Sequence, residues 1–134
     1  MGSKSPYPIK IVVVDDNEVI RQLVCKVLHR PPEWELVGEA TDGIVAVEVV
    51  KQVQPDIVIM DVQLPRLDGI EATKRIACSV PKKPIIIGFS TFGDVFTHKA
   101  MQAAGSAAFV PKEDLFDLPH VIEQIIQPPS DLTR

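Results

Sequence analysis

Five polar side chains stand at or just beyond the ends of apolar runs in this chain: Asp15, Asp16, Asp61, Ser90 and Lys112. Three of them are carboxylates, and oxygen ligands of this kind suit Mg²⁺, which keeps several waters and recruits phosphate oxygens. A carboxylate can also accept a phosphoryl group, a reaction that is catalysed chiefly by positioning and by charge neutralisation. A hydroxyl and an ammonium would each take one phosphoryl oxygen. Together these residue types indicate phosphoryl transfer to Asp61.

Taken one at a time, these residues are not specific. The segment 15–17 alone is more often a strand-to-helix cap than a metal site, and Asp61 alone would as readily turn the chain after a core strand. Ser90 alone is uninformative, and Lys112 alone is ordinarily a solvated surface lysine. The specific signal is their joint position, because ligands of open parallel sheets bind outside the carboxyl ends of the strands.

Apolar runs without polar alternation precede these positions. Such runs, rich in β-branched residues, are typical of strands that are buried on both faces in a parallel sheet. With a further short run that starts at a tryptophan, the sequence predicts five strands, at residues 9–14, 34–40, 57–61, 85–90 and 107–110.

Segments with helical spacing of apolar residues lie between these strands. The segment 44–53 is rich in valine, so propensity alone would also allow a strand there. We predict a helix because Val47, Val50 and Val53 repeat every three residues and the length suits a crossover. Another helix is predicted to begin after Asn17, its N-cap, and to end at Pro31-Pro32. Three more are predicted at residues 70–80, 94–104 (with Gly105 as C-cap) and 118–126.

Strand and helix therefore alternate five times, which favours an α/β fold with helices on both faces of a doubly wound parallel sheet. We expect a five-stranded, flavodoxin-like (βα)5 sheet in the order 2-1-3-4-5. This order makes the first and third strands neighbours, so Asp15, Asp16 and Asp61 would converge. Such a cluster is costly unless protons or a cation neutralise it. The sequence therefore predicts Mg²⁺ as the cofactor.

The length of 134 residues predicts one domain, which we place at residues 8–127, between a disordered arm at 1–7 and a tail or linker start at 128–134. The net charge of −4 argues against direct nucleic-acid contact. No apolar run approaches the roughly 20 residues that cross a membrane, and residues 1–6 lack the apolar core that is typical of a signal peptide. Cys25 and Cys78 lie far apart, which predicts two reduced thiols in a cytoplasmic protein.

Several motifs resemble the receiver domain of two-component response regulators: V-V-D-D-N, G-E-A-T-D-G, P-D-I-V-I-M-D-V-Q-L-P-R-L-D-G-I-E-A-T and A-A-G-S-A-A-F-V-P-K. They span nearly the whole chain, and the third is the most specific. The resemblance implies that Asp61 is the phosphoacceptor, with a sensor histidine kinase or phosphotransfer protein as donor. It further implies that Asp15, Asp16 and the main-chain carbonyl of Gln63 hold Mg²⁺ beside it.

The resemblance also implies a switch. Ser90 and Lys112 would contact the phosphoryl group, and Phe109 would be the aromatic residue whose rotamer follows phosphorylation. The surface of the last two helices and the fifth strand would then change and control an output partner, as a local charge event that biases two states. Dimerisation through the last two helices is left open. The chain is not expected to be an enzyme beyond its own phosphorylation and dephosphorylation.

Three residues depart from the usual pattern of this family. Leu64 stands where methionine is usual, and Thr91 follows Ser90 where alanine is usual. Lys112 is followed by Glu113 rather than by proline. This last feature, with the run G-I-E-A-T, is similar to receivers that are attached to helix-turn-helix DNA-binding outputs, which implies a role in transcription regulation.

Three alternatives remain at this stage. One is a receiver-like module that signals through contacts without phosphorylation, and the intact acidic and basic residues argue against it. Another is an aspartyl-phosphate phosphatase, which usually has a second aspartate two residues after the nucleophile, where this chain has Gln63. Flavin binding is disfavoured because no Gly/Ser/Thr-rich phosphate loop follows the first strand.

Overall fold

The computed structural model describes residues 8–91 and 95–126. The expected arm at 1–7, the expected tail at 128–134 and Asp94, which was expected to begin the fourth helix, lie outside the described residues. The strands are β1 Ile9–Val14, β2 Trp34–Ala40, β3 Ile57–Asp61, β4 Ile85–Ser90 and β5 Ala108–Pro111. The helices are α1 Glu18–Val27, α2 Gly43–Val53, α3 Gly69–Ser79, α4 Val95–Ala104, the 3₁₀ helix η1 Lys112–Asp117 and α5 Leu118–Ile126.

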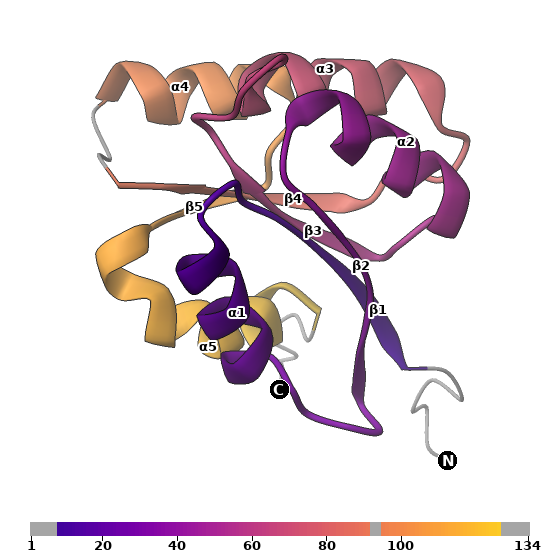
Figure 1. Ribbon diagram of the computed structural model, residues 1–134, viewed down its shortest axis with the longest axis vertical. Helices are drawn as coiled ribbons and strands as arrows, with labels where there is room; N and C mark the ends of the chain where they lie inside the picture. Colours follow the sequence, from indigo (N-terminus) through magenta and orange to yellow (C-terminus); the bar gives the residue numbers. More distant parts are fainter. Residues whose placement is uncertain (1–7, 92–94, 127–134) are drawn as a thin grey trace, which may run out of the picture.

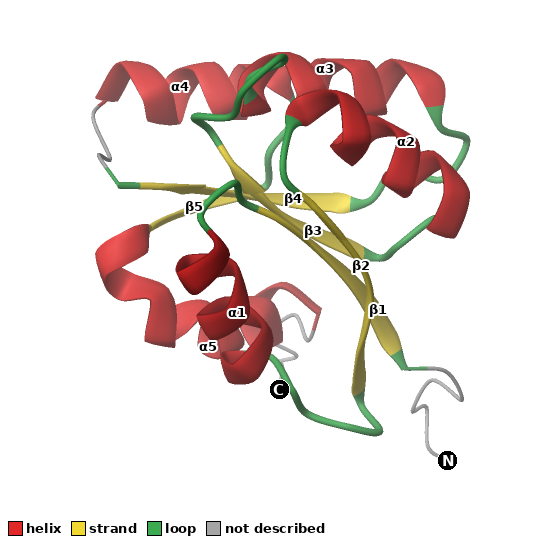
Figure 2. Cartoon of the chain, in the orientation of Figure 1, coloured by secondary structure: helices red, strands yellow, loops and turns green. Residues whose placement is uncertain are grey.

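These strands form one parallel sheet in the order β2-β1-β3-β4-β5. Helices α2, α3 and α4 cover one face of the sheet, and α1 and α5 cover the other (Figures 1 and 2). The predicted doubly wound α/β fold and its strand order are therefore confirmed. The switch in strand order lies between β1 and β3, the pair that carries the aspartates.

The central strand β3 is buried along its whole length. Its side chains alternate between the two faces of the sheet, so Val58 and Met60 pack in the core under α2, α3 and α4. Ile57 and Ile59 pack in the second core, with residues of α1 and α5. Because both faces are covered, the strand is apolar without alternation until it ends at Asp61.

Side chains with short polar groups start the first three helices. Asn17, Asp42 and Asp68 each accept a hydrogen bond from the main-chain N–H three residues later, at 3.0, 2.9 and 2.8 Å. The valine-rich α2 is a helix, as predicted, because Val47 and Val50 lie on its buried side. Tertiary packing decides its structure against the preference of valine for strands.

Besides shifts of one residue at the start of α2 and at both ends of α3, the structure differs from the prediction in two elements and adds a third. Helix α1 ends at Val27, before the two prolines are reached, and β5 is displaced by one residue toward Pro111. The 3₁₀ helix η1 was not predicted; it buries Leu115 and connects β5 to α5. Short 3₁₀ segments are common connectors, and their spacing of three leaves little apolar pattern to detect. The bond between Pro31 and Pro32 is cis.

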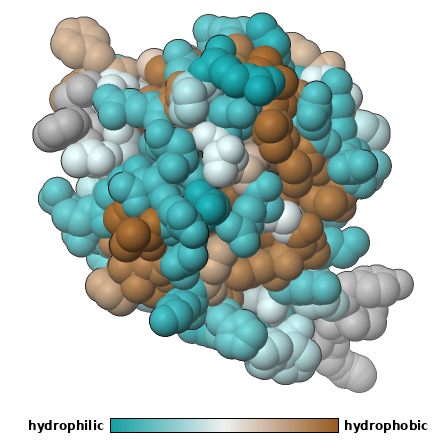
Figure 3. Space-filling view, in the orientation of Figure 1, coloured by the Kyte–Doolittle hydropathy of each residue, from teal (hydrophilic) through white to brown (hydrophobic). Residues whose placement is uncertain are grey.

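The surface carries a few large hydrophobic side chains. Figure 3 shows hydrophobic areas over α1 and α2 among hydrophilic side chains. The most exposed large hydrophobic residues of the described chain are Val19 on α1, Val95 and Phe96 on α4, and Phe116 on η1. No helix among the described residues is long and apolar enough to cross a bilayer.

Candidate functional site

The register of the central strands brings Asp15 and Asp61 to the same edge of the sheet. Val14, the last residue of β1, pairs with Met60 of β3. The next residue of each chain segment is an aspartate, so the two side chains emerge next to each other. This is the edge at which open parallel sheets bind their ligands.

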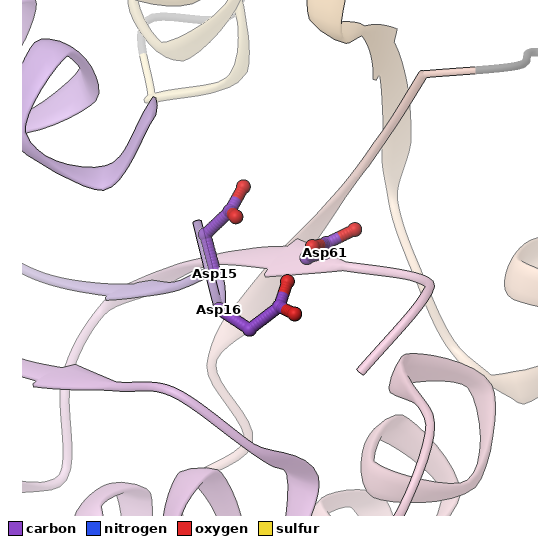
Figure 4. Close-up of side chains that lie close together, drawn as sticks. All are labelled: Asp15, Asp16 and Asp61. Atoms are coloured by element: carbon purple, nitrogen blue, oxygen red, sulfur yellow. The ribbon is translucent and has the colours of Figure 1, made fainter. Parts of the chain in front are cut away.

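The carboxylates of Asp15, Asp16 and Asp61 form an acidic cluster at this edge (Figure 4). Each contributes one oxygen atom, and these oxygen atoms lie within 4.8 Å of one another. Asp15 and Asp61 are buried, with exposed fractions of 0% and 2%, whereas Asp16 is exposed. The cluster therefore has two carboxylates in the protein interior and one on the rim.

The ammonium group of Lys112 lies beside the two buried carboxylates. Its Nζ atom is 2.9 Å from Asp15 Oδ2 and 3.1 Å from Asp61 Oδ2. Pro111 pairs with Ser90 at the end of β5, and Lys112 directly follows, so the same register that orders the sheet delivers the lysine. The lysine thus pairs with two of the three carboxylates, and the cluster carries excess negative charge when all are ionised.

Main-chain N–H groups hold the other oxygen atom of each buried carboxylate. Asn17 donates to Asp15 Oδ1 at 2.9 Å, and Gln63 donates to Asp61 Oδ1 at 3.2 Å. In both cases the donor is two residues after the aspartate, which is the pattern of an Asx turn. Each aspartate is therefore oriented by its own turn and presents its Oδ2 atom to Lys112.

Burial, and after it the charge of Asp15, raise the pKa of Asp61 from its ordinary value of 3.8 to about 6, against the opposing effects of Lys112 and of the Gln63 N–H. Burial also lowers the pKa of Lys112, but its contacts with Asp15 and Asp61 outweigh that effect and raise the pKa above its ordinary value. Near neutral pH the lysine is therefore charged, and Asp61 is mostly ionised.

A divalent cation fits this set of donors. All three carboxylates offer oxygen, which suits Mg²⁺ better than a softer metal. Asp15 Oδ2 is buried, and among the described residues its one partner is the ammonium of Lys112, with which it forms an ion pair. An additional cation would satisfy this atom and offset the excess negative charge.

The structure places two other predicted site residues close to this edge. Ser90 ends β4 and is buried, with 2% of its surface exposed. It follows Phe89, which pairs with Asp61, so it lies one residue further along the neighbouring strand. Gln63 lies two residues after Asp61, and its side chain is exposed. The role of its carbonyl oxygen as a metal ligand stays a prediction.

Phe109, the predicted switch residue, is half-buried and lies against β4 and α4. It pairs with Gly88, where an added Cβ atom would lie only 2.8 Å from the Phe109 ring. The ring also stacks on His98 of α4, with centroids 5.0 Å apart. Thr91 is exposed in the structure.

Two residues near the cluster were missed by the sequence analysis. Gly69 lies so close to β3 that an added Cβ atom would be 2.0 Å from the Asp61 carbonyl oxygen, so only glycine fits there. Arg21 of α1 donates to the main-chain oxygen of Asp15 at 3.0 Å. The D-G pair at 68–69 was visible as a turn signal, but nothing in the local sequence distinguishes Arg21 from a surface arginine.

Comparison with protein-family models matches residues 11–125 to the response regulator receiver domain. Among curated proteins, the chain is 37% identical over 105 residues to protein-glutamate methylesterase/protein-glutamine glutaminase 4 of Myxococcus xanthus (strain DK1622), covering 78% of this chain and 30% of that protein. It is 44% identical over 107 residues to the enzyme of the same name from Nocardioides sp. (strain ATCC BAA-499 / JS614), covering 78% and 29%. The chain thus spans less than a third of these curated relatives.

Solved structures give the same picture. A two-component response regulator of the LuxR family from Aurantimonas sp. SI85-9A1 superposes with a TM-score of 0.82 at 31% identity, over 89% of this chain and 85% of that one. The response regulator domain of Thermotoga maritima CheB superposes with a TM-score of 0.77 at 29% identity, over 90% and 95%. Both solved structures therefore share the fold described above over most of their chains.

Proposed function

The chain belongs to the family of response regulator receiver domains, and on this premise we propose that it accepts a phosphoryl group on the carboxylate of Asp61. A receiver domain is a signalling domain, so the modification would act as a signal and not as a step in metabolism. One observation carries the proposal: Asp61 lies in a cluster of three carboxylates, two of which share the ammonium of Lys112, at the ligand-binding edge of the sheet.

The charges around Asp61 support this reaction. Asp61 would attack the phosphorus atom in line; a new O–P bond forms while the bond to the donor breaks, and its electron pair stays with the donor. Lys112 would bind an oxygen of the transferred group, and the Ser90 hydroxyl would donate to another. Mg²⁺ held by Asp15, Asp16 and Asp61, with the Gln63 carbonyl, would supply further positive charge for these oxygens.

We further propose that a phosphohistidine of a sensor histidine kinase or of a phosphotransfer protein is the donor, and that modification shifts Ser90 and Phe109. The exposed hydrophobic residues of α4 and η1 adjoin the surface expected to change. The domain unit would run from residue 8 to 127 and would be cytoplasmic. Because the chain spans under a third of its curated relatives, the output that it controls in a longer protein, catalytic or DNA-binding, remains part of this proposal.

The test is intact-mass spectrometry after incubation with acetyl phosphate and MgCl₂. The wild-type chain should gain one phosphoryl group, and Asp61→Asn should gain none. The matched control is Asp56→Asn, at the opposite end of the same strand, which should gain the group like the wild type.

Replacing MgCl₂ with EDTA should abolish the gain in all variants. A gain of equal size in Asp61→Asn would contradict the assignment of the acceptor. No gain in the wild type would favour the alternative of a module that signals through contacts alone.

A further inference from the structure

Arg21 links α1, the main chain after β1 and β2, next to the acidic cluster. It lies on α1, and only 16% of its side chain is exposed. Its Nη1 atom donates to the main-chain oxygen of Asp15 at 3.0 Å, and its Nε atom donates to Glu39 Oε1 of β2 at 2.7 Å. The guanidinium group thus uses two of its fixed donor directions at once, which a lysine could not do in the same geometry.

The carbonyl that Arg21 binds belongs to the peptide group between Asp15 and Asp16. A peptide group is planar, so fixing its oxygen also fixes the main-chain nitrogen of Asp16 and the direction in which the chain continues. The Asp15 carboxylate has its own hydrogen bond from Asn17. The Asp16 carboxylate is exposed, and among the described residues no donor holds it, so its position depends on its main chain.

We propose that Arg21 is a positioning residue for the divalent-cation site, because it holds the peptide that links two of the carboxylate ligands. This inference rests on the proposed function, since it requires that the cluster binds a cation. Arg21 itself touches neither the cation nor the phosphoryl group. Outer residues that orient metal ligands typically change metal affinity by about 10- to 100-fold when they are replaced.

A purely electrostatic role for Arg21 predicts the opposite result. A positive charge near the cluster repels a second cation, so its removal would strengthen Mg²⁺ binding. Loss of positioning weakens binding instead, because Asp16 is no longer held. The sign of the change therefore separates the two roles.

The test is Mg²⁺ affinity by isothermal titration calorimetry for wild type, Arg21→Gln and Arg21→Lys. We expect Arg21→Gln to bind Mg²⁺ on the order of 10-fold more weakly. Arg21→Lys should be intermediate or equally weak, since lysine keeps the positive charge but lacks the two fixed N–H directions of the guanidinium group. Arg21→Lys also decides the question if Arg21→Gln does not fold. Affinity in either folded variant that equals or exceeds that of the wild type overturns the inference.

Arg30→Gln is the matched control. Arg30 also links separate elements, through Glu123 of α5 and the ring of Trp34, but it lies beside the start of β2, at the other end of the sheet. Its replacement should lower the melting temperature and leave Mg²⁺ affinity unchanged. If Arg30→Gln weakens Mg²⁺ binding as much as Arg21→Gln does, the effect of Arg21 is general destabilisation and the inference fails.

A second readout needs no metal. In Mg²⁺-free buffer, Arg21→Gln should accelerate hydrogen exchange at the Asn17 amide, which bonds Asp15 Oδ1, and Arg30→Gln should not. Unchanged exchange in Arg21→Gln overturns the inference. If wild type binds no Mg²⁺ but Asn17 exchange does respond, the cation site of the proposed function fails while the positioning of the Asp15–Asp16 peptide stands.

Discussion

Asp56 and Asp61 lie at opposite ends of β3, and the structure treats these two carboxylates in opposite ways. Asp56 accepts hydrogen bonds from the Lys10 main-chain N–H at 2.8 Å and from Lys82 Nζ at 2.7 Å. Burial raises the pKa of Asp56, but these donors outweigh burial and hold the pKa below its ordinary value. Asp61 shares its lysine with another buried carboxylate, and its pKa is raised to about 6.

The comparison separates a carboxylate that stabilises the fold from the one that we propose as the phosphoacceptor. At the amino end of β3, donors outnumber the acceptor and the charged form stabilises the folded chain. At the carboxyl end, negative charges outnumber the single cation, so the folded chain carries an unfavourable negative charge. A bound metal ion would neutralise this charge, and a phosphoryl donor would react with it. The residue type is the same, but the partners and the burial differ, since the side chain of Asp56 is 31% exposed and that of Asp61 only 3%.

The largest expected effect follows from removing the shared lysine. Lys112→Met should lower the rate of phosphoryl transfer from acetyl phosphate by about 100-fold, because a donor that stabilises developing charge is lost from a buried site. It should also raise the pKa of Asp61 above its present value of about 6, since the ammonium opposes the rise. Rates come from intact mass over time. A rate within threefold of the wild type would show that Lys112 is not part of the reaction.

Replacing Asp61 and replacing Asp56 should change the free energy of unfolding in opposite directions. Without divalent cations at pH 7, Asp61→Asn should raise the free energy of unfolding by about 1–2 kcal/mol, because it removes the buried negative charge of a carboxyl group whose pKa is raised. A shift of one pKa unit corresponds to about 1.4 kcal/mol, and screening by solvent reduces the energy that the full shift would give. Asp56→Asn should lower it by about 0.5–1 kcal/mol, because the bond to Lys10 survives but the charge does not. Urea unfolding measures both. Changes of the same sign would refute the comparison.

The pH dependence of these two variants should differ accordingly. The folded pKa of Asp61 lies above its unfolded value of 3.8, so its contribution to stability is present below about pH 4 and is lost as pH rises toward about 6. The advantage of Asp61→Asn should therefore disappear below about pH 4. The folded pKa of Asp56 is lowered, so its contribution is present above about pH 4 and is lost as pH falls. Parallel stability profiles for the two variants would contradict these assignments.

The smallest expected effect is at the structural lysine. Lys82→Met should lower the free energy of unfolding by less than about 1 kcal/mol, because the pair with Asp56 is half-exposed and Asp56 keeps the Lys10 N–H. Phosphoryl transfer should proceed at the wild-type rate, which makes this variant the control for Lys112→Met. A loss of rate comparable to that of Lys112→Met would mean that both ends of β3 affect the reaction.

Much of the fold is predictable from the sequence, because buried parallel strands leave uninterrupted apolar runs and crossover helices leave a different period. The convergence of Asp15, Asp16 and Asp61 follows from strand order alone. The position of Lys112 between two carboxylates does not, since it depends on side-chain directions at the ends of three strands. The role of Arg21 is not predictable either, because its partner is a main-chain oxygen, and every residue has a main-chain oxygen.

The donor balance around Asp61 is equally hidden from the sequence. The pKa depends on burial and on which lysine reaches which oxygen, and both are set by packing between segments about fifty residues apart in the chain. Element boundaries near β5 were displaced for a related reason: η1 is a single short segment whose structure is fixed by the burial of Leu115. Local patterns predict elements well, and contacts across the sheet less well.

Gly88 has a further consequence for chemical control of this domain. A methyl group there would lie 2.8 Å from the Phe109 ring and 3.2 Å from the end of Met101, so Gly88→Ala would act as a wedge beneath the aromatic side chain. Phe109, the residue that it would push, is its partner on β5, and its partner on β3 is Met60, which directly precedes Asp61. A single added carbon atom would thus displace the aromatic ring without removing any charged group of the acidic cluster.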